Sequence, residues 1–325
     1  MSRIAFIFRT DVHAADKGPI SWKGDYCAEV FESLGQVGDL AQEHDVTAVL
    51  DGGDFFHVKA PGRNSHGLIY DTGRLHNERY KGRRVYSIEG NHDLMGNNLD
   101  TIENQPLGVL YVTGVFHHLR EEVFEVDGLR VRVVGVPYSP SRDLAEIQDL
   151  RKQPGDDYMV AVVHALAAED PPAHVEDFFG EPVFRYSSFI FEGGPDVFCF
   201  GHWHRDQGIV ELEGRHFVNQ GALSRGALTK ENTERTPKVS LIEFTKEGIK
   251  TTAISLRVAP AEEVFDFDRK ERQEKESLVI TQFVEQLEAD MQIDPTQDVE
   301  ANVRSLNFAP EVRERALAYL ERARS

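Results

Sequence analysis

The stretch Ile88-Glu89-Gly90-Asn91-His92-Asp93 places an amide, an imidazole and a carboxylate directly behind a glycine. A run with strand character, Arg84 to Ile88, leads into it, so these side chains are expected at the carboxyl end of a strand, where open α/β sheets hold their ligands. Asn91 can offer a carbonyl oxygen to a hard metal ion, and His92 can donate a proton. Taken alone, the same residues would equally fit an ordinary polar turn.

Four further clusters follow other apolar runs. Ile4 to Phe8 leads to Asp11 and His13, which share one face of an extended chain and could reach the same ion. Val46 to Leu50 leads to Asp51-Gly52-Gly53-Asp54, where the glycines allow a sharp turn close to an ion. We favour Asp54 over Asp51 as a bridging ligand, because Asp51 lies nearer the body of the strand.

The last two clusters consist of histidines. Tyr158 to Val163 is followed directly by His164, and Asp196 to Phe200 is followed by Gly201-His202-Trp203-His204. A single histidine at a strand end is more often structural than ligating. Together with the earlier clusters, however, these imidazoles complete a set of nitrogen and oxygen donors without thiolate, which suits two borderline-to-hard divalent ions. Two such ions about 3.5 to 4 Å apart can clamp a phosphoryl group and activate water.

The rest of the pattern predicts a mixed α/β protein. Asp25 to Gln42 has apolar residues at helical spacing between the first two predicted strands, which predicts a parallel βαβ unit. The remaining predictions are a helix within Arg63 to Tyr80, paired strands from Val109 to Val136 around Asp127-Gly128, a long loop from Ala165 to Arg185 beside a substrate groove, a hairpin around Glu213-Gly214, and an antiparallel pair from Lys238 to Leu256.

The order and spacing of the five clusters resemble the calcineurin-like metallophosphoesterase superfamily. This resemblance implies a two-layered β-sandwich flanked by helices instead of a plain doubly wound sheet. It also implies that one ion is held by Asp11, His13, Asp54 and His204, and the other by Asp54, Asn91, His164 and His202. His92 would then be a proton donor and not a ligand, and the neighbouring Asp93 could orient and charge its ring.

One loop is similar to a narrower group within that superfamily. Gly52 to Pro61, Gly-Gly-Asp-Phe-Phe-His-Val-Lys-Ala-Pro, resembles the corresponding loop of the double-strand-break repair nucleases of the SbcD and Mre-eleven type, and Val136-Pro137-Tyr138 also resembles them. The likeness implies that His57 contacts the substrate beside the scissile phosphate. Protein phosphatases of the superfamily instead carry Val-Asp-Arg-Gly after the bridging aspartate, and this chain does not.

Composition limits the partners and the compartment. With 36 basic and 55 acidic residues, the 325-residue chain has a formal net charge of −19, which argues against a generally basic, nucleic-acid-coating surface. Bound cations would have to supply positive charge locally. Two cysteines, Cys27 and Cys199, do not predict a disulfide framework or a zinc-thiolate site. No run approaches the roughly 20 apolar residues of a membrane span, so we expect a soluble cytoplasmic protein without a membrane contact.

The chain is predicted to hold a catalytic domain over residues 1–258 and a charged helical extension over 259–325. Phe265 to Asp290 and Pro310 to Arg324 have sparse apolar positions on a charged background. These helices either pack on the catalytic core or form a docking site. In the nucleases that the loop resembles, a helical tail grips the coiled coil of an SMC-like ATPase. A homodimer is also compatible with the sequence.

The predicted activity is hydrolysis of phosphodiesters by a dinuclear metal centre, with DNA as the expected substrate in repair or recombination, by an exo- or endonuclease of the SbcD type. Manganese is the expected metal, and Mg²⁺, Fe²⁺, Zn²⁺ or Ni²⁺ are alternatives. Two other hypotheses stay open. One is a phosphoesterase for nucleotides or other small phosphoesters, and the other is a metal-binding scaffold without turnover.

Overall fold

Strand β1, Ile4–Arg9, lies in the interior of the fold, and both of its faces are buried. Ile4, Phe6 and Phe8 point into the core between two sheets, whereas Ala5 and Ile7 point into the core beneath the helices. Side chains of a strand alternate between its faces, so an uninterrupted apolar run is the pattern of a strand covered on both sides. The computed structural model describes residues 2–172, 174–269, 300, 303–304 and 310–324.

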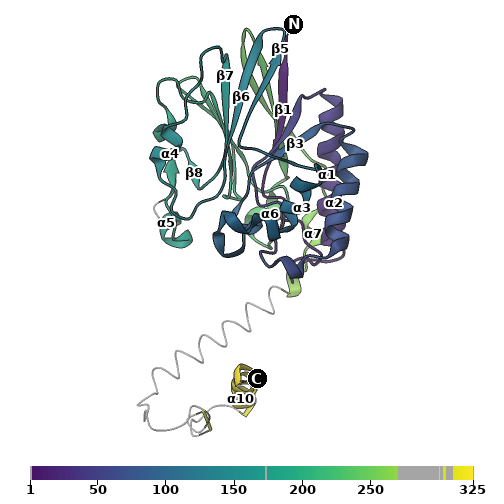
Figure 1. The fold of residues 1–325 in the computed structure, drawn as a ribbon. Helices are drawn as coiled ribbons and strands as arrows, with labels where there is room; N and C mark the ends of the chain where they lie inside the picture. The colour runs from purple at the N-terminus through teal and green to yellow at the C-terminus, as the bar shows by residue number, and fades with distance from the viewer. Residues whose placement is uncertain (1, 173, 270–299, 301–302, 305–309, 325) are drawn as a thin grey trace. The chain divides into compact units, whose positions relative to one another are not determined.

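Two six-stranded mixed sheets pack face to face (Figure 1). The first has the order β14-β13-β1-β2-β3-β4 and the second β11-β12-β10-β7-β6-β5. The remaining strands of the first sheet are β2 Ala48–Asp51, β3 Arg84–Ser87, β4 His117–His118, β13 Lys238–Thr245 and β14 Gly248–Ser255. Those of the second are β5 Glu121–Val126, β6 Leu129–Val136, β7 Tyr158–His164, β10 Val197–Gly201, β11 Asp206–Leu212 and β12 Arg215–Gln220.

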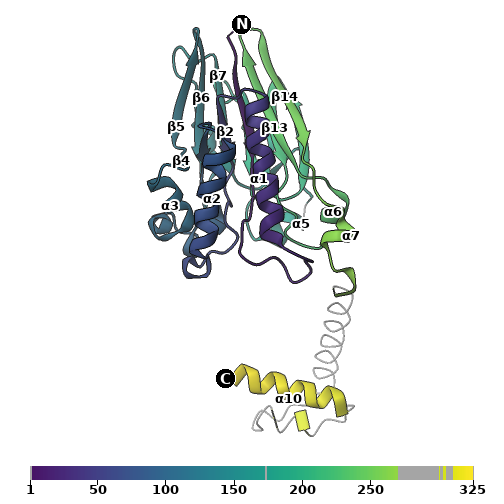
Figure 2. The same ribbon diagram turned by 90° about the vertical axis from the view of Figure 1, so that its right-hand side faces the viewer.

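Helices cover the outer faces of the sandwich. Helix α1, Tyr26–Glu43, begins after Asp25, whose side chain accepts the Ala28 N–H, and α2, His66–Arg79, begins after Ser65 in the same way. Both lie in front of the first sheet in Figure 2. The other helices of this part of the chain are α3 Pro106–Val112, α4 Leu144–Gln148, α5 His174–Phe179, α6 Lys230–Glu234 and α7 Ala261–Val264. A separate helix, α10, spans Pro310–Arg324. Short 3₁₀ turns span Pro61–Arg63, Asn91–Asp93, Met95–Asn97, Leu99–Asn104 and Tyr186–Phe189.

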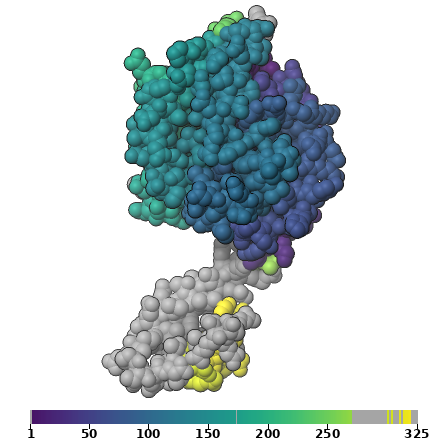
Figure 3. Space-filling view, in the orientation of Figure 1, coloured from purple at the N-terminus to yellow at the C-terminus, as the bar shows by residue number. Residues whose placement is uncertain are grey.

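The predicted sandwich flanked by helices is therefore confirmed, and so is the parallel β1-α1-β2 unit. The halves of the sandwich pack closely in the space-filling view, where mostly teal segments of the second sheet adjoin purple and blue segments of the first (Figure 3). The hairpins around Asp127-Gly128 and Glu213-Gly214 are also confirmed. Within the part of the chain described, no helix combines the length and the apolar character needed to cross a bilayer.

Two predictions of local structure were wrong. Val109 lies in α3 and not in a strand, because Pro106 starts a helix whose buried residues pack against the first core. The expected loop from Ala165 to Arg185 contains α5 and a small parallel pair, β8 Ala167–Ala168 with β9 Phe184–Arg185. We call this segment the arm. Its pairing joins residues far apart in sequence, which local composition does not reveal.

Contacts divide the chain into two compact units, Met1–Phe267 and Asp268–Ser325. In the first, Trp22, Leu228, Val264 and Phe265 form a small apolar cluster near the end of the unit. In the second, the helix predicted from Pro310 to Arg324 is confirmed as α10. Most of the helix predicted from Phe265 to Asp290 lies outside the described residues.

Candidate metal centre

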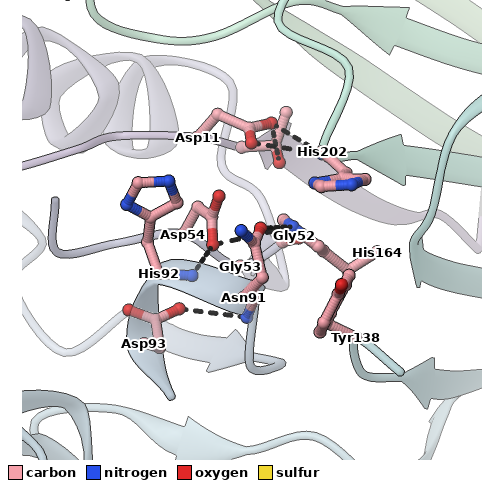
Figure 4. A network of polar contacts seen from close by, with 12 residues as sticks. Asp11, Gly52, Gly53, Asp54, Asn91, His92, Asp93, Tyr138, His164 and His202 are labelled. Atoms are coloured by element: carbon pink, nitrogen blue, oxygen red, sulfur yellow. Dashed lines mark hydrogen bonds and ion pairs between the residues drawn. The ribbon is translucent and has the colours of Figure 1, made fainter. Parts of the chain in front are cut away.

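Polar residues that follow β1, β2, β3, β7 and β10 gather at one edge of the sandwich (Figure 4). Strands β1, β2 and β3 run parallel, as do β7 and β10, so their carboxyl ends deliver these residues to a common place. Figure 4 shows side chains from both sheets converging there. The structure brings together all of the predicted ligands, namely Asp11, His13, Asp54, Asn91, His164, His202 and His204.

The first group of donors consists of Asp11, His13, Asp54 and His204, whose ligand atoms all lie within 4.8 Å of one another. The Nε2 atoms of His13 and His204 are 2.9 Å apart. His13 Nε2 lies 3.7 Å from Asp54 Oδ2, and His204 Nε2 lies 3.5 Å from Asp11 Oδ1. Three of these side chains are buried, while the side chain of His204 is 52% exposed, so the group opens to the surface on that side.

The second group consists of Asp54, His164 and His202, so the Asp54 carboxylate belongs to both groups. His164 Nε2 lies 3.6 Å from Asp54 Oδ1 and 3.4 Å from Asn91 Oδ1. The Nδ1 atom of His164 is 2.7 Å from the Gly52 carbonyl oxygen. Because a carbonyl only accepts hydrogen bonds, Nδ1 carries a hydrogen, and Nε2 is the atom that a neutral ring can offer to an ion.

These spacings fit divalent cations. Donors bound at about 2.1 Å to one ion lie roughly 3.0 to 3.4 Å apart when they are neighbours at right or tetrahedral angles. The donor pairs named above are 2.9 Å to 3.7 Å apart, close to that range, and all donors of a group lie within 4.8 Å of one another. In addition, Asp54 Oδ2 is buried and has no hydrogen-bond partner among the described residues. A buried carboxylate oxygen without a partner is costly, and a cation beside it would remove that cost.

The pKa values of His164, Asp54 and His13 also show that positive charge is favoured beside the buried Asp54 carboxylate. Burial opposes a charge on His164, but the Asp54 carboxylate raises the pKa of His164 to about 9. Burial likewise opposes ionisation of Asp54, yet His164 and His13 hold the pKa of Asp54 well below its usual value. Burial, with His204 beside it, lowers the pKa of His13 well below its usual value, so this ring is neutral and has a lone pair to offer.

Four of the candidate ligands have strained backbones. Asp11, His13, Asp54 and His202 have φ angles of 51°, 49°, 53° and 87°, in the left-handed region that residues with a Cβ rarely adopt. Such residues cost on the order of 1–3 kcal/mol each and concentrate at functional sites. The positive φ angles therefore coincide with candidate ligands that follow β1, β2 and β10.

Two glycines, Gly53 and Gly90, allow the loop that carries Asp54 to lie close to the loop that carries Asn91. Gly53 has a φ of 92°, and a Cβ there would lie 2.6 Å from the Gly90 nitrogen and 2.8 Å from His164 Nδ1. A Cβ on Gly90 would overlap Asp54 Oδ1. Both positions therefore require glycine, since any side chain would push the Asp54 loop away from the Asn91 loop.

Asp51, the alternative to Asp54 as a bridging ligand, has a different partner. Its carboxylate forms a fully buried ion pair with Arg9, with 2.7 Å between Arg9 Nε and Asp51 Oδ2. Its second oxygen accepts the Gly53 N–H. Asp51 is thus occupied inside the sheet, whereas Asp54 is shared by both donor groups.

His92 lies at the edge of the site, and its contacts correct the role predicted for Asp93. His92 Nδ1 is 2.6 Å from the carbonyl oxygen of His57, and the His92 N–H donates to Asp54 Oδ1 at 2.7 Å. Asp93 does not orient the ring. Its carboxylate accepts backbone N–H groups of Phe55, Phe56 and Gly90, so it ties the two ligand loops together. Burial and the charge of Asp54 raise the pKa of Asp93 well above its usual value.

His57, predicted to contact the substrate, is exposed and lies at the mouth of the site. Its ring stacks on that of His92 with 5.2 Å between centroids, and its Nδ1 is 3.3 Å from His13 Nδ1. His13, His57 and His92 also form a third group with ligand atoms within 4.8 Å of one another, which the sequence analysis did not foresee. The residue is exposed at the surface, but its ring lies among other imidazoles, and this partial desolvation together with the neighbouring His92 lowers the pKa of His57.

Two residues beside the second group were not predicted as site residues. Glu181, from the arm, has its Oε2 3.1 Å from His202 Nε2, and its Oε1 accepts the Tyr138 hydroxyl at 2.6 Å. Tyr138 belongs to the Val136-Pro137-Tyr138 segment noted for its likeness to nucleases, but Glu181 stands in no motif. Burial opposes ionisation of Glu181, yet hydrogen bonds from His202 and Tyr138 lower its pKa.

Two hollows flank the candidate centre. The smaller, of about 230 Å³, is lined by His13, His57, His92 and His204 together with Lys17 and Arg235. The larger, of about 630 Å³, extends from Asp54, Asn91 and His202 to the arm, where Phe178 and Phe179 line it. Phe178 is 80% exposed, and the ring of Phe179 lies 6.2 Å from that of His202. The larger hollow therefore begins at the candidate centre and ends on an aromatic surface.

A solved structure shares this fold at low sequence identity. It is a provisionally named 5'-nucleotidase from Staphylococcus aureus in complex with alpha-ketoglutarate, with 15% identity and a TM-score of 0.52 over 84% of this chain. This chain spans only 58% of the length of that protein.

Two weaker matches were also found. GAP50, the anchor in the inner membrane complex of Plasmodium, is 10% identical, with a TM-score of 0.48 over 78% of this chain and 85% of its own. The calcineurin-like phosphoesterase YfkN from Bacillus subtilis is 13% identical, with a TM-score of 0.39 over 78% of this chain and 91% of its own.

No curated protein matches the sequence. The family model of the calcineurin-like phosphoesterases, in contrast, matches residues 4–206, which is more than half of the 325-residue chain and contains every candidate ligand. The architecture, the five strand-end clusters and this match agree, and the chain belongs to the calcineurin-like phosphoesterase family.

Proposed function

We propose that this protein is a metal-dependent phosphodiesterase that acts on nucleic acid, with DNA as its substrate. The observation that carries the proposal is the pair of donor groups that share the Asp54 carboxylate. A carboxylate common to two groups is the arrangement needed to hold two ions side by side. Asp11, His13 and His204 would complete one site, and Asn91, His164 and His202 the other.

In the proposed reaction, the bound ions and His92 would have different roles. Two bound divalent ions would supply Lewis acidity toward the phosphoryl oxygens and toward the attacking water. His92 would protonate the leaving oxygen. Because its Nδ1 faces a carbonyl oxygen and so carries a hydrogen, the charged ring can give up only the proton on Nε2. The donor set, nitrogen and oxygen without sulfur, favours manganese or a similar divalent ion.

The nucleic-acid substrate is supported by the loop from Gly52 to Pro61 and by the larger hollow. The loop resembles that of the SbcD-type repair nucleases, and its His57 stands at the mouth of the site. Lys59 of the same loop donates to Asn97 Oδ1 at 3.0 Å, which ties this loop to the turn at Met95–Asn97. The hollow is lined by Asn91 and His202 of the centre and also by the exposed Phe178.

The direct test is a panel of substrates assayed with Mn²⁺, in which single-stranded DNA, duplex DNA, cyclic nucleotides and methyl nitrophenyl phosphate are compared. Hydrolysis of DNA at a higher kcat/KM than the other substrates supports the proposal. A preference for cyclic nucleotides would favour the alternative, a phosphoesterase for nucleotides or other small phosphoesters, for which the smaller hollow with Lys17 and Arg235 provides the space. No turnover of any substrate by metal-loaded protein would support the metal-binding scaffold instead.

A double substitution of Phe178 and Phe179 by alanine should selectively impair DNA cleavage. Stacking of a base on an aromatic ring contributes about 1–3 kcal/mol, so kcat/KM for a single-stranded oligonucleotide should fall at least about fivefold. The value for methyl nitrophenyl phosphate, which has no base, should stay the same. Tyr70→Ala, which removes a similarly exposed aromatic ring that lines neither hollow, is the matched control. Equal losses on both substrates would contradict base stacking.

The second unit is proposed to dock a coiled-coil ATPase partner, and this partner, like a homodimer, stays a prediction. Deleting Asp268–Ser325 should leave hydrolysis of methyl nitrophenyl phosphate within about a factor of two, because the first unit contains every candidate ligand and its own cores. Activity, circular dichroism and thermal unfolding of the truncated chain would measure this. Loss of folded protein would show that the second unit is needed for the stability of the catalytic unit.

A further inference from the structure

The imidazole of His202 is fixed by a residue from the arm. His202 Nε2 lies 3.1 Å from Glu181 Oε2, and the side chain of His202 is only 8% exposed. An ionised carboxylate has no hydrogen to donate, so the hydrogen between these atoms belongs to Nε2. A neutral imidazole carries one hydrogen, and with that hydrogen on Nε2 the lone pair is on Nδ1.

Glu181 is itself held in place. The hydroxyl of Tyr138, which is 2% exposed, donates to Glu181 Oε1 at 2.6 Å. Tyr138 follows β6 and its N–H donates to the Glu89 carbonyl oxygen, so it is attached to the loop that carries Asn91. Glu181 therefore has one oxygen fixed by the sandwich and the other turned toward His202.

We infer that Glu181 is a positioning residue, which accepts the hydrogen of His202 Nε2 and thereby leaves Nδ1 of His202 free to bind an ion. This inference rests on the proposed ligand role of His202. Glu181 does not act as a ligand itself, because its carboxylate is not among the donors that lie within 4.8 Å of one another around Asp54. A carboxylate behind a ligating histidine orients the ring and raises its basicity.

His164 shows the same principle with a different partner. Its Nδ1 carries a hydrogen toward the Gly52 carbonyl, and Nε2 faces Asp54 and Asn91. The two histidines of the second group thus use opposite nitrogens, each selected by the acceptor behind the ring. For His164 that acceptor belongs to the sandwich, whereas for His202 it comes from the arm. The tautomer of His202, and with it the second ion site, consequently depends on a residue of the arm.

The test measures binding of Mn²⁺ to the full chain, stripped of metal with a chelator, by titration calorimetry. Loss of a carboxylate behind a ligating histidine costs about 10- to 100-fold in metal affinity. Glu181→Ala should therefore weaken one of the two ions by that factor and leave the other unchanged. Glu181→Gln should keep most of the affinity, because its amide oxygen can still accept the Nε2 hydrogen. Glu176→Ala, an exposed carboxylate on the same arm, is the matched control and should bind both ions normally.

A spectroscopic measurement separates positioning from a general effect on the fold. In ¹⁵N-histidine NMR spectra of the metal-free protein, the His202 signal, identified by its absence in His202→Ala, should show the hydrogen on Nε2. In Glu181→Ala it should move toward a mixture of the two tautomers, while the His164 signal stays unchanged. An unchanged His202 tautomer in Glu181→Ala would overturn the inference.

The binding data also distinguish the ways in which the inference can fail. If Glu181→Gln lost as much affinity as Glu181→Ala, Glu181 would be a ligand. Tighter binding in Glu181→Ala would show that the carboxylate competes with the ion for the ring. If His202→Ala itself bound two ions normally, the proposed ligand set would be wrong. If His202→Ala lost one ion but Glu181→Ala lost none, only the positioning role would be overturned.

Discussion

Replacing Asp54 by asparagine is expected to abolish phosphodiester hydrolysis and to lower the metal content of the purified protein. Asp54 is the one residue common to both donor groups, and it is 1% exposed. The substitution preserves the shape of the side chain but removes the negative charge that two neighbouring cations require. Asparagine also tolerates the left-handed backbone at this position, where φ is 53°, so the fold should survive.

Metal analysis by mass spectrometry and a diesterase assay would measure both effects. Asp127→Asn is the matched control, because Asp127 also has a positive φ, of 47°, but lies in the β5-β6 hairpin away from the site. It should keep full metal content and activity. Two tightly bound ions with normal turnover in Asp54→Asn would rule out Asp54 as the bridge.

The second large effect is expected for His92→Gln, which should reduce kcat for DNA about 10²- to 10⁴-fold without loss of metal. General acid catalysis typically contributes a factor of that size, and glutamine cannot supply the proton. The backbone N–H of residue 92, which donates to Asp54 Oδ1, is retained in the variant, so the Asp54 loop should keep its position. A nitrophenolate leaving group, already stable as an anion, should be affected less than the alkoxide of DNA.

The comparison of the two leaving groups is therefore the decisive measurement. His66→Gln, at the start of α2, provides a histidine control that lines neither hollow beside the site. Full nuclease activity in His92→Gln would show that this ring is dispensable. Loss of bound ions would instead make His92 a ligand, which would fit its membership in the third group, with His13 and His57.

Most of the fold was predictable because the signals are local. β1, β2, β7 and β10 are short apolar runs, and the predicted strands differ from the observed ones by one or two residues at their ends. The error at Val109 arose because an apolar segment of this length fits a helix or a strand equally well. Pro106, at the first position of α3, is the residue that indicates a helix here.

By itself, the sequence determined which residues stand at the carboxyl ends of the strands, since strand, glycine and polar side chain follow one another along the chain. Only the tertiary structure decided what each side chain does there. In the folded chain Asp51 forms an ion pair with Arg9, Asp93 accepts hydrogen bonds from backbone N–H groups, and the His92 ring donates to the His57 carbonyl. It also brings Glu181 to His202 across 21 residues. These contacts depend on how separate loops pack in space, and no spacing within one segment encodes them.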